Sequence, residues 1–188
     1  NYMYGDKPVT YHVEGFLYPS TYEFPVHVSA KDVLKTMTSE MNKKLTPSVR
    51  EKIKEKGLTI YEFITLASLV EREALFDEDR HIIASVFLKR LSINMPLQSC
   101  ASIEYLLGTR KPILSIEDTQ IDSPYNTYLH TGLPPGPIAN PSEKSMEAVL
   151  NAKATDYLYF VADEKGHHHF SKTYDEHLKT IESIYGKE

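Results

Sequence analysis

The 188-residue sequence lacks tryptophan, contains a single cysteine and has no long apolar run. One cysteine, Cys100, excludes an intrachain disulfide. Without about 18 consecutive apolar residues, no part of this sequence is expected to span a membrane. The net charge of −5 argues against a nucleic-acid partner, because such proteins normally present a basic face. Since the chain starts without methionine and shows no signal peptide, we interpret it as an excised domain, so missing membrane or targeting segments are not evidence that the protein has none.

The motifs of several common enzyme classes are also missing. The sequence has no G-x-S-x-G, P-loop or G-x-G-x-x-G, so serine hydrolase, nucleotide and dinucleotide sites lack their signatures. H-E-x-x-H is absent, and the histidines at 167–169 and His177 have no cysteine or carboxylate at zinc-ligand spacing. Cys100, in LQSCAS, has no signature of a nucleophile. We therefore expect no metal site.

Capping signals and hydrophobic periodicity predict mostly helices. Thr59 and Glu62 form a capping box before a helix over about 60–75, and Thr173 with Glu176 starts the last helix. The remaining helices are expected from about 29 to 45, from Pro47 to Gly57, and over about 77–91, 99–107 and 141–151.

Strand-like composition occurs near both ends of the chain. Residues 9–24 are β-branched and aromatic and predict one or two short strands, while TDYLYFVAD and HHHFS predict a hairpin across DEKG. The expected class is α+β, with a central helical pair that carries the candidate acid and short strands forming a small sheet or hairpins. We expect a β-rich segment over 1–28 that joins a catalytic domain over 29–188.

Two glutamates stand close together in the predicted helix over 60–75. On a regular helix, Glu71 falls among Ile60, Ile64 and other apolar residues, whereas Glu73 falls on the edge of that face. Burial should raise the pKa of Glu71 and keep it protonated, as a general acid requires. The alternative for Glu71 is a buried ion pair or a loop cap. Glu73 is expected to be a charge on the helix surface.

The second unusual stretch is the connection over 123–141, SPYNTYLHTGLPPGPIANP. It combines polar side chains and tyrosines with five prolines. Long loops stiffened by proline are often binding loops, because less entropy is lost on binding. The alternative is a structural wrap around the core.

An ordered set of segments carries a family resemblance: VEGFLYPSTYEF, ASLVERE, ASVFLKRL, NMPLQS, SPYNTYLHTGLPPGPIANP, and ATDYLYFVAD with HHFSKTYDEH. In this set, which covers nearly the whole chain, the sequence resembles the endolytic murein transglycosylases of the YceG-like family. The resemblance implies the catalytic portion, without the cytoplasmic tail, the transmembrane helix and most of the LysM-like part. Cys100 stands where many members have an aspartate, so that aspartate cannot be a universal catalytic partner.

The resemblance also implies a reaction. It is the non-hydrolytic cleavage of the β-1,4 bond between N-acetylmuramic acid and N-acetylglucosamine in nascent glycan strands, which leaves 1,6-anhydro ends and terminates elongation. The family's catalytic glutamate is the first acid of ASLVERE, here Glu71. It would protonate the glycosidic oxygen and then accept the proton of the C6 hydroxyl. An internal nucleophile removes the need for a second carboxylate, and no metal or organic cofactor is implied.

Further expectations concern substrate contacts, partners and location. Glu14 and His168 match family positions near the site. The implied partners are peptidoglycan strands and, with them, peptidoglycan synthases and elongation or division proteins. The implied location is the outer face of the bacterial cell membrane, by a single-pass anchor. The candidate substrate-binding residues are Gln98, Tyr125, Asn126, Thr127, Glu14, Glu73 and His168.

Two other functions stay open at this point. A muramidase that uses water would need a second carboxylate in reach of the first, such as Glu73 or Glu14. A non-enzymatic scaffold of the cell wall or the division complex would use Glu71 only structurally.

Overall fold

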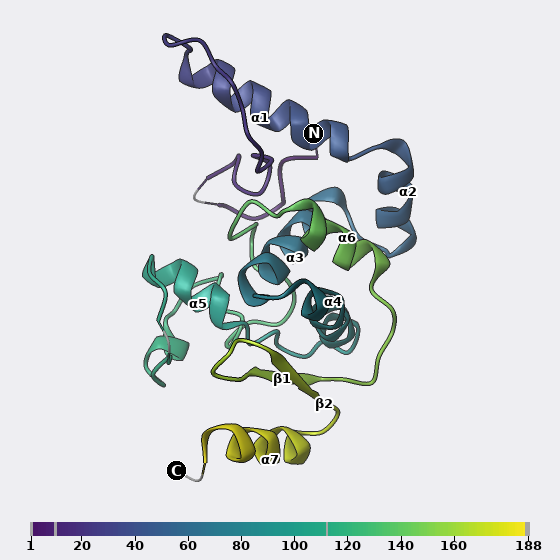
Figure 1. The fold of residues 1–188 in the computed structure, drawn as a ribbon, viewed down its shortest axis with the longest axis vertical. Helices are drawn as coiled ribbons and strands as arrows, with labels where there is room; N and C mark the ends of the chain where they lie inside the picture. The colour runs from purple at the N-terminus through teal and green to yellow at the C-terminus, as the bar shows by residue number, and fades with distance from the viewer. Residues whose placement is uncertain (1, 10, 112, 187–188) are drawn as a thin grey trace.

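Helices make up most of the fold in the computed structural model, which describes residues 2–9, 11–111 and 113–186. Figure 1 shows α1 and α7 at opposite ends of the long axis, with the other helices between them. The helices are α1 (Ala30–Lys44), α2 (Pro47–Glu55), α3 (Ile60–Glu73), α4 (Asp77–Ser92), α5 (Cys100–Leu107), α6 (Glu143–Asn151) and α7 (Tyr174–Tyr185), and a short 3-10 helix, η1, covers Asp118–Gln120.

The predicted helix starts are confirmed by their caps. Thr59 Oγ1 accepts from the backbone N–H of Glu62 at 3.1 Å, and Glu62 Oε2 accepts from the backbone N–H of Thr59 at 2.8 Å. Thr173 and Glu176 form the same reciprocal pair at the start of α7. Each pair satisfies two N–H groups that a helix leaves without a partner. The helix expected over 60–75 ends two residues earlier, at Glu73.

α3 lies in the middle of the core and packs against α4, α5 and α6. Every residue from Phe63 to Val70 has 1% or less of its surface exposed, including Thr65 and Ser68. A helix that is buried all round has no solvent face. The division of this helix into an apolar face and a polar face is therefore wrong from Phe63 to Val70.

The predicted strands within 9–24 are wrong. Residue 10 lies outside the described residues, and the described residues of 2–28 form turns and extended stretches without a strand. The aromatic residues of this segment pack on the core: Phe16 is 1% exposed and its ring stacks on Tyr61 at 5.9 Å. Gly15 has φ +85°, and a Cβ atom there would collide with Pro137. The segment is thus held by side-chain contacts with the core and the 123–141 connection, so its composition does not indicate strand pairing.

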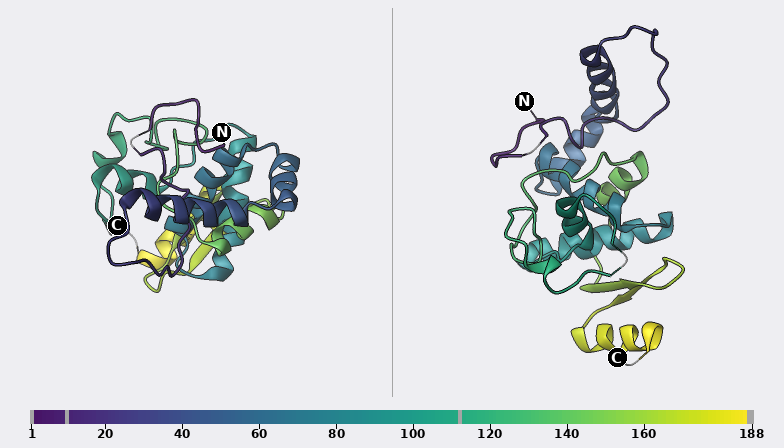
Figure 2. Two further views of the ribbon diagram at one scale, coloured as in Figure 1. Left: turned by 90° about the horizontal axis from the view of Figure 1, so that it is seen from above. Right: turned by 90° about the vertical axis from the view of Figure 1, so that its left-hand side faces the viewer.

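The predicted C-terminal hairpin is confirmed. β1 (Tyr159–Ala162) and β2 (His168–Ser171) pair antiparallel, with Phe160 opposite Phe170 and Val161 opposite His169. α7 packs on this hairpin on the side away from the core, as the right-hand view of Figure 2 shows. The small sheet therefore separates α7 from the central helices. Over the described residues, the fold is a mostly helical domain with one two-stranded sheet near the C-terminus, so the strands expected at this end are present and those expected near the N-terminus are not.

Among the described residues, no helix is both long enough and apolar enough to cross a membrane.

Candidate active site

The two glutamates at the end of α3 interact with different helices. Glu71 contacts the start of α6, and Glu73 contacts the start of α5. Both helix starts present backbone N–H groups and the positive end of a helix dipole, which favour a nearby carboxylate. Because the two helix starts are alike in this respect, the difference between Glu71 and Glu73 comes from the other side chains around each carboxyl.

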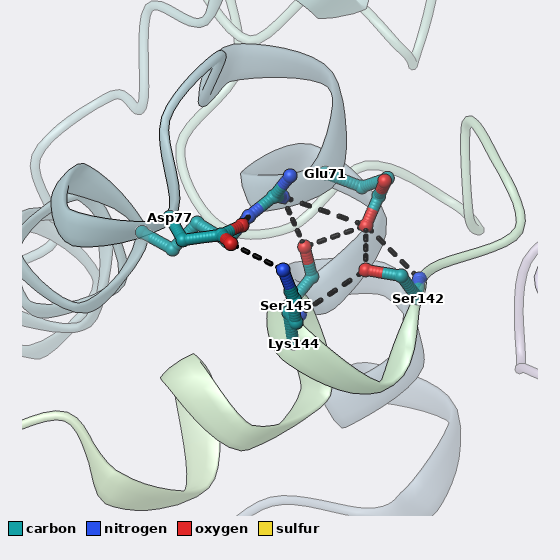
Figure 3. Close-up of polar contacts among 6 residues, drawn as sticks. Glu71, Asp77, Ser142, Lys144 and Ser145 are labelled. Carbon is teal, nitrogen blue, oxygen red and sulfur yellow. Dashed lines mark hydrogen bonds and ion pairs between the residues drawn. The ribbon is translucent and has the colours of Figure 1, made fainter.

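Glu71 is tied into a polar network that Figure 3 shows. Its Oε2 accepts from Ser142 N at 2.9 Å, from Ser142 Oγ at 2.6 Å and from Ser145 Oγ at 2.6 Å. Arg80 Nη1 lies 3.5 Å from the same oxygen and also donates to Ser145 Oγ at 2.6 Å. Asp77 extends the network, since it pairs with both Arg80 and Lys144.

This network determines the charge of Glu71. Burial alone would raise its pKa, but the hydrogen bonds from Ser142 and Ser145 and the charge of Arg80 outweigh burial and hold the pKa below its usual range. The expectation of a raised pKa at Glu71 is wrong. The side chain lies near Arg80, as in the alternative of an ion pair, and it contacts a helix start where a loop cap was the other possibility.

Glu73 has the surroundings that were expected for Glu71. Its Oε1 accepts a short hydrogen bond from Ser99 Oγ and a longer one, 3.4 Å, from the backbone N–H of Ala101. Burial raises the pKa of this carboxyl, although the hydrogen bonds from Ser99 and Ala101 and the nearby His168 oppose the shift. The expectation of a solvated surface charge at Glu73 is wrong. The cause is the start of α5, which packs against the last turn of α3 and brings Ser99 and Ala101 to the Glu73 carboxyl.

Glu73 lines a cavity of about 270 Å³ between the start of α5 and the C-terminal hairpin with α7. A buried arginine, Arg90 of α4, also lines it; Arg90 is 6% exposed and donates to the carbonyls of Leu97 and Leu158, each at 2.7 Å. The other lining residues are Leu97, Gln98, Cys100, Tyr128, Tyr159, Phe160, Val161, Tyr174 and His177.

Two lining residues come from the LQSCAS segment. Gln98 adopts φ +48°, a left-handed conformation that is uncommon outside glycine, and its N–H donates to Thr127 O at 3.0 Å. Cys100 Sγ lies 3.1 Å from the Tyr128 hydroxyl. Loss of hydration and the neighbouring Glu73 raise the pKa of Cys100 to about 11. The thiol is therefore protonated at neutral pH and is not an activated nucleophile.

The 123–141 connection reaches this cavity through Tyr128. Thr127, the residue before it, is 2% exposed and holds the start of α5: its Oγ1 accepts from Ser99 N at 3.0 Å and lies 2.9 Å from Ser102 Oγ. Thr127 thus positions Ser99, which in turn contacts Glu73. In the structure Thr127 acts on the site through its neighbours.

Asn126 and Tyr125 are also buried, at 0% and 7% exposure. Asn126 Nδ2 donates to Thr119 O at 3.0 Å and to Ile121 O at 2.8 Å, and its Oδ1 accepts from Tyr128 N at 2.9 Å. The ring of Tyr125 packs on that of Tyr105 at 5.0 Å. These side chains are engaged within the fold and do not line the Glu73 cavity.

Glu14 and His168 also have internal partners. Glu14 Oε2 accepts from the Tyr105 hydroxyl at 2.6 Å, and burial raises the pKa of Glu14. The His168 side chain is 4% exposed, and its Nδ1 lies 3.0 Å from Asp79 Oδ2. His168 lies near enough to influence the charge of Glu73, whereas Glu14 interacts with α5 and is absent from the cavity lining.

The sequence reasoning missed five residues of this arrangement. Ser99 lies in the LQS segment, Tyr128 in the 123–141 connection, and His177 at the end of HHFSKTYDEH. These segments carry the family resemblance, which could have identified the three residues as candidates. Arg90 and Tyr159 gave no separate signal, because their roles depend on contacts between segments far apart in the chain. Among the described residues, no three histidine, cysteine, aspartate or glutamate side chains are grouped so that they could hold a metal ion.

Comparisons with known proteins agree with the sequence resemblance. The model of the YceG-like family matches residues 3–183. The chain is 42% identical over 178 residues to the endolytic murein transglycosylase of Bacillus subtilis, an alignment that covers 94% of this chain and 49% of the relative. It is 39% identical over 182 residues to the protein of the same name from Streptococcus pneumoniae D39, covering 94% of this chain and 33% of the relative.

The fold is similar to a crystal structure of a YceG-like protein from Listeria monocytogenes, with a TM-score of 0.87 and 41% identity. That similarity covers 93% of this chain and 57% of the Listeria chain. The chain spans between a third and a half of the length of the curated relatives it matches. On the extent of these matches, the chain belongs to the YceG-like family.

Proposed function

We propose that this chain carries the catalytic site of a peptidoglycan lytic transglycosylase and that Glu73, rather than Glu71, is its general acid. One observation carries the assignment: Glu73 is the carboxyl that both lines a cavity and has its pKa raised by burial. A carboxyl that stays protonated toward neutral pH can donate a proton to a leaving oxygen. The curated relatives named endolytic murein transglycosylases support the reaction class.

The proposed reaction needs one carboxyl. Glu73 gives its proton to the glycosidic oxygen between N-acetylmuramic acid and N-acetylglucosamine, and the electron pair of the breaking C1–O bond goes to that oxygen. The C6 hydroxyl oxygen of the same muramic acid then bonds to C1, and its proton passes to the Glu73 carboxylate. The products are a 1,6-anhydro end and a free hydroxyl, with no water consumed. Ser99, which donates to Glu73, stabilises the carboxylate between the two steps.

The cavity favours this reaction over hydrolysis. Glycosidases that use water or a covalent intermediate place two carboxyls about 5–10 Å apart. Among the described residues that line the cavity, Glu73 is the only carboxylate, and the position next to Ser99 is occupied by Cys100. A protonated thiol cannot replace a second carboxylate as base.

The substrate determines the proposed location and partners. Glycan strands are assembled outside the cell membrane, so we infer that this domain acts on the outer face and is held there by a membrane anchor outside this sequence. Cleavage within nascent strands would set glycan length and would require proximity to peptidoglycan synthases. A role in the elongation or division complex follows from the same reasoning.

The test is digestion of purified peptidoglycan followed by mass spectrometry of the products. Wild-type protein should release anhydro-muramyl ends. Glu73→Gln should reduce their formation by about 10³-fold, within the range of general acid catalysis. Glu71→Gln, the matched control on the same helix turn, should retain cleavage in the fraction that is folded.

Three results would contradict the proposal. Reducing ends in place of anhydro ends would indicate a muramidase. No products from correctly folded wild-type protein would indicate a scaffold. Full activity in Glu73→Gln, with loss in a folded Glu71→Gln protein, would return the acid to Glu71.

A further inference from the structure

His177 is the unexplained polar group of the Glu73 cavity. It lies on α7, lines the cavity, and its Nδ1 is buried without a hydrogen-bond partner among the residues that the structure describes. Buried polar atoms nearly always have a partner, so an unpaired one needs a reason. In addition, burial and the charge of Arg90 lower the pKa of His177. The ring is therefore neutral near pH 7, with one donor and one acceptor nitrogen.

The surroundings of His177 fit a sugar ring. Tyr159 stacks on His177 with centroids 5.4 Å apart and planes at 25°, and Tyr174 lies 5.7 Å from Tyr159. Tyr174 is 57% exposed, so part of this aromatic group is open to solvent. Aromatic rings next to a few polar groups are suited to a ligand with apolar C–H faces and hydroxyls around them. The cavity, at about 270 Å³, lies just below the range of about 300–1,000 Å³ for drug-sized ligands, which favours one sugar unit over several.

We propose that His177 is a substrate-binding residue, whose ring hydrogen-bonds a hydroxyl or N-acetyl group of one hexosamine unit held against Tyr159 and Tyr174 beside Glu73. This inference rests on the proposed function for the identity of the sugar, but not on the chemical step. It gives the hairpin and α7 a role in substrate recognition. The side of the Glu73 cavity that the hairpin and α7 form, opposite the start of α5, then belongs to the binding site.

The experiment measures binding apart from cleavage. In a Glu73→Gln background, the affinity for the tetramer of N-acetylglucosamine is measured by calorimetry. His177→Phe keeps a ring that can stack on Tyr159 but has no nitrogen, and it should weaken binding about five- to tenfold, the value of one hydrogen bond. His177→Asn, whose amide lies where Nδ1 was, should bind more tightly than His177→Phe. His169→Phe is the control, because His169 lies on β2, the strand before α7, outside the cavity lining, and its side chain is 47% exposed.

A second readout separates a contact from a structural effect. The ¹⁵N signals of the His177 ring should shift when the tetramer saturates the protein, and those of His169 should not. The inference is overturned if His177→Phe binds as tightly as the parent, if it binds as tightly as His177→Asn, or if the His177 signals do not respond. Wild-type protein that forms anhydro ends while His177→Phe binds normally would leave the proposed function intact and reject His177. Tetramer binding through His177 without anhydro ends would do the reverse.

Discussion

At the residue scale, the pKa of a carboxyl near a helix start depends on how many hydrogen-bond donors contact it. Glu71 receives three hydrogen bonds on one oxygen and lies near Arg80. Glu73 receives a short bond from Ser99 and a long one from Ala101, and burial dominates. Similar positions two residues apart thus produce pKa shifts of opposite sign.

The shift at Glu73 predicts how activity depends on pH. A general acid must be protonated, so the rate should fall as the pH rises through the raised pKa of Glu73. Ser99→Ala removes a hydrogen bond that lowers this pKa, so the fall should move to higher pH. Ser99 makes no side-chain cap on α5, so the helix start should persist. A pH–rate profile checks this, with Ser92→Ala, at an exposed position of α4, as the control. A fall that moves to lower pH would contradict the role of Ser99.

The same shifts predict opposite changes in stability. The folded pKa of Glu71 lies below its unfolded value, so its ionised form contributes stability above the unfolded pKa, and the contribution is lost as the pH falls through the folded pKa. The folded pKa of Glu73 lies above its unfolded value, so its ionisation costs stability as the pH rises. Glu71→Gln should therefore lower the free energy of unfolding at about pH 7 by about 2 kcal/mol, and Glu73→Gln should raise it.

Urea unfolding of both variants at about pH 7 and about pH 4 tests these signs. The effect of Glu71→Gln should shrink toward the lower pH, where the wild-type carboxyl begins to be protonated. Two variants that change stability in the same direction at neutral pH would show that the contacts around one of the glutamates are misassigned.

At the element scale, the helices were predictable because their signals are local. Thr59 with Glu62 and Thr173 with Glu176 define helix starts within four residues of sequence. The strands expected within 9–24 had no such basis, since a strand needs a partner that composition does not reveal. Aromatic residues in such a segment can also pack on the core, as Phe16 does. The hairpin was predictable because its partner follows directly across a short turn.

The 123–141 connection leads to a prediction about Asn126. Its side-chain amide donates to two carbonyls, and its oxygen accepts from Tyr128 N. Asn126→Asp keeps the acceptor but replaces both donors with a charged oxygen. We expect a loss of about 3 kcal/mol in the free energy of unfolding, because two carbonyls lose partners next to a buried charge. Activity should fall with it, since Tyr128 lines the cavity.

Thermal or urea unfolding measures this loss, with Thr131→Ala at an exposed position of the same connection as the control. The expectation that Asn126 binds substrate directly makes a different prediction. If Asn126→Asp were as stable as wild type but bound glycan strands more weakly, Asn126 would contact the substrate, and its three hydrogen bonds within the fold would be secondary.

At the scale of the whole molecule, the cavity is assembled from segments that lie far apart in the sequence. Glu73 comes from α3, Cys100 from α5, Tyr128 from the 123–141 connection, and the opposite wall from the hairpin and α7. No helical wheel contains this arrangement, because a wheel assumes one core face and one solvent face. The sequence therefore led to this pair of glutamates, of which we propose Glu73, rather than the expected Glu71, as the acid. The positions of α5 and α6 against the last turn of α3 distinguish them, because α5 contacts Glu73 and α6 contacts Glu71.

Arg90 connects the two sides of the cavity, because it contacts both the segment before α5 and the segment before β1. Its guanidinium donates to the carbonyls of Leu97, before α5, and Leu158, before β1, and it lies 5.3 Å from the Tyr159 ring centroid. A lysine has a single nitrogen and cannot reproduce this fork. Arg90→Lys should therefore destabilise the fold by about 2–4 kcal/mol and lower the rate of anhydro-end formation at least about tenfold, because both walls lose their fixed spacing. Arg110→Lys, at a side chain that is 68% exposed, should do neither. If Arg90→Lys lost stability but kept full activity per folded molecule, the spacing of the two walls would not matter for catalysis, and the cavity would not be where the glycan reacts.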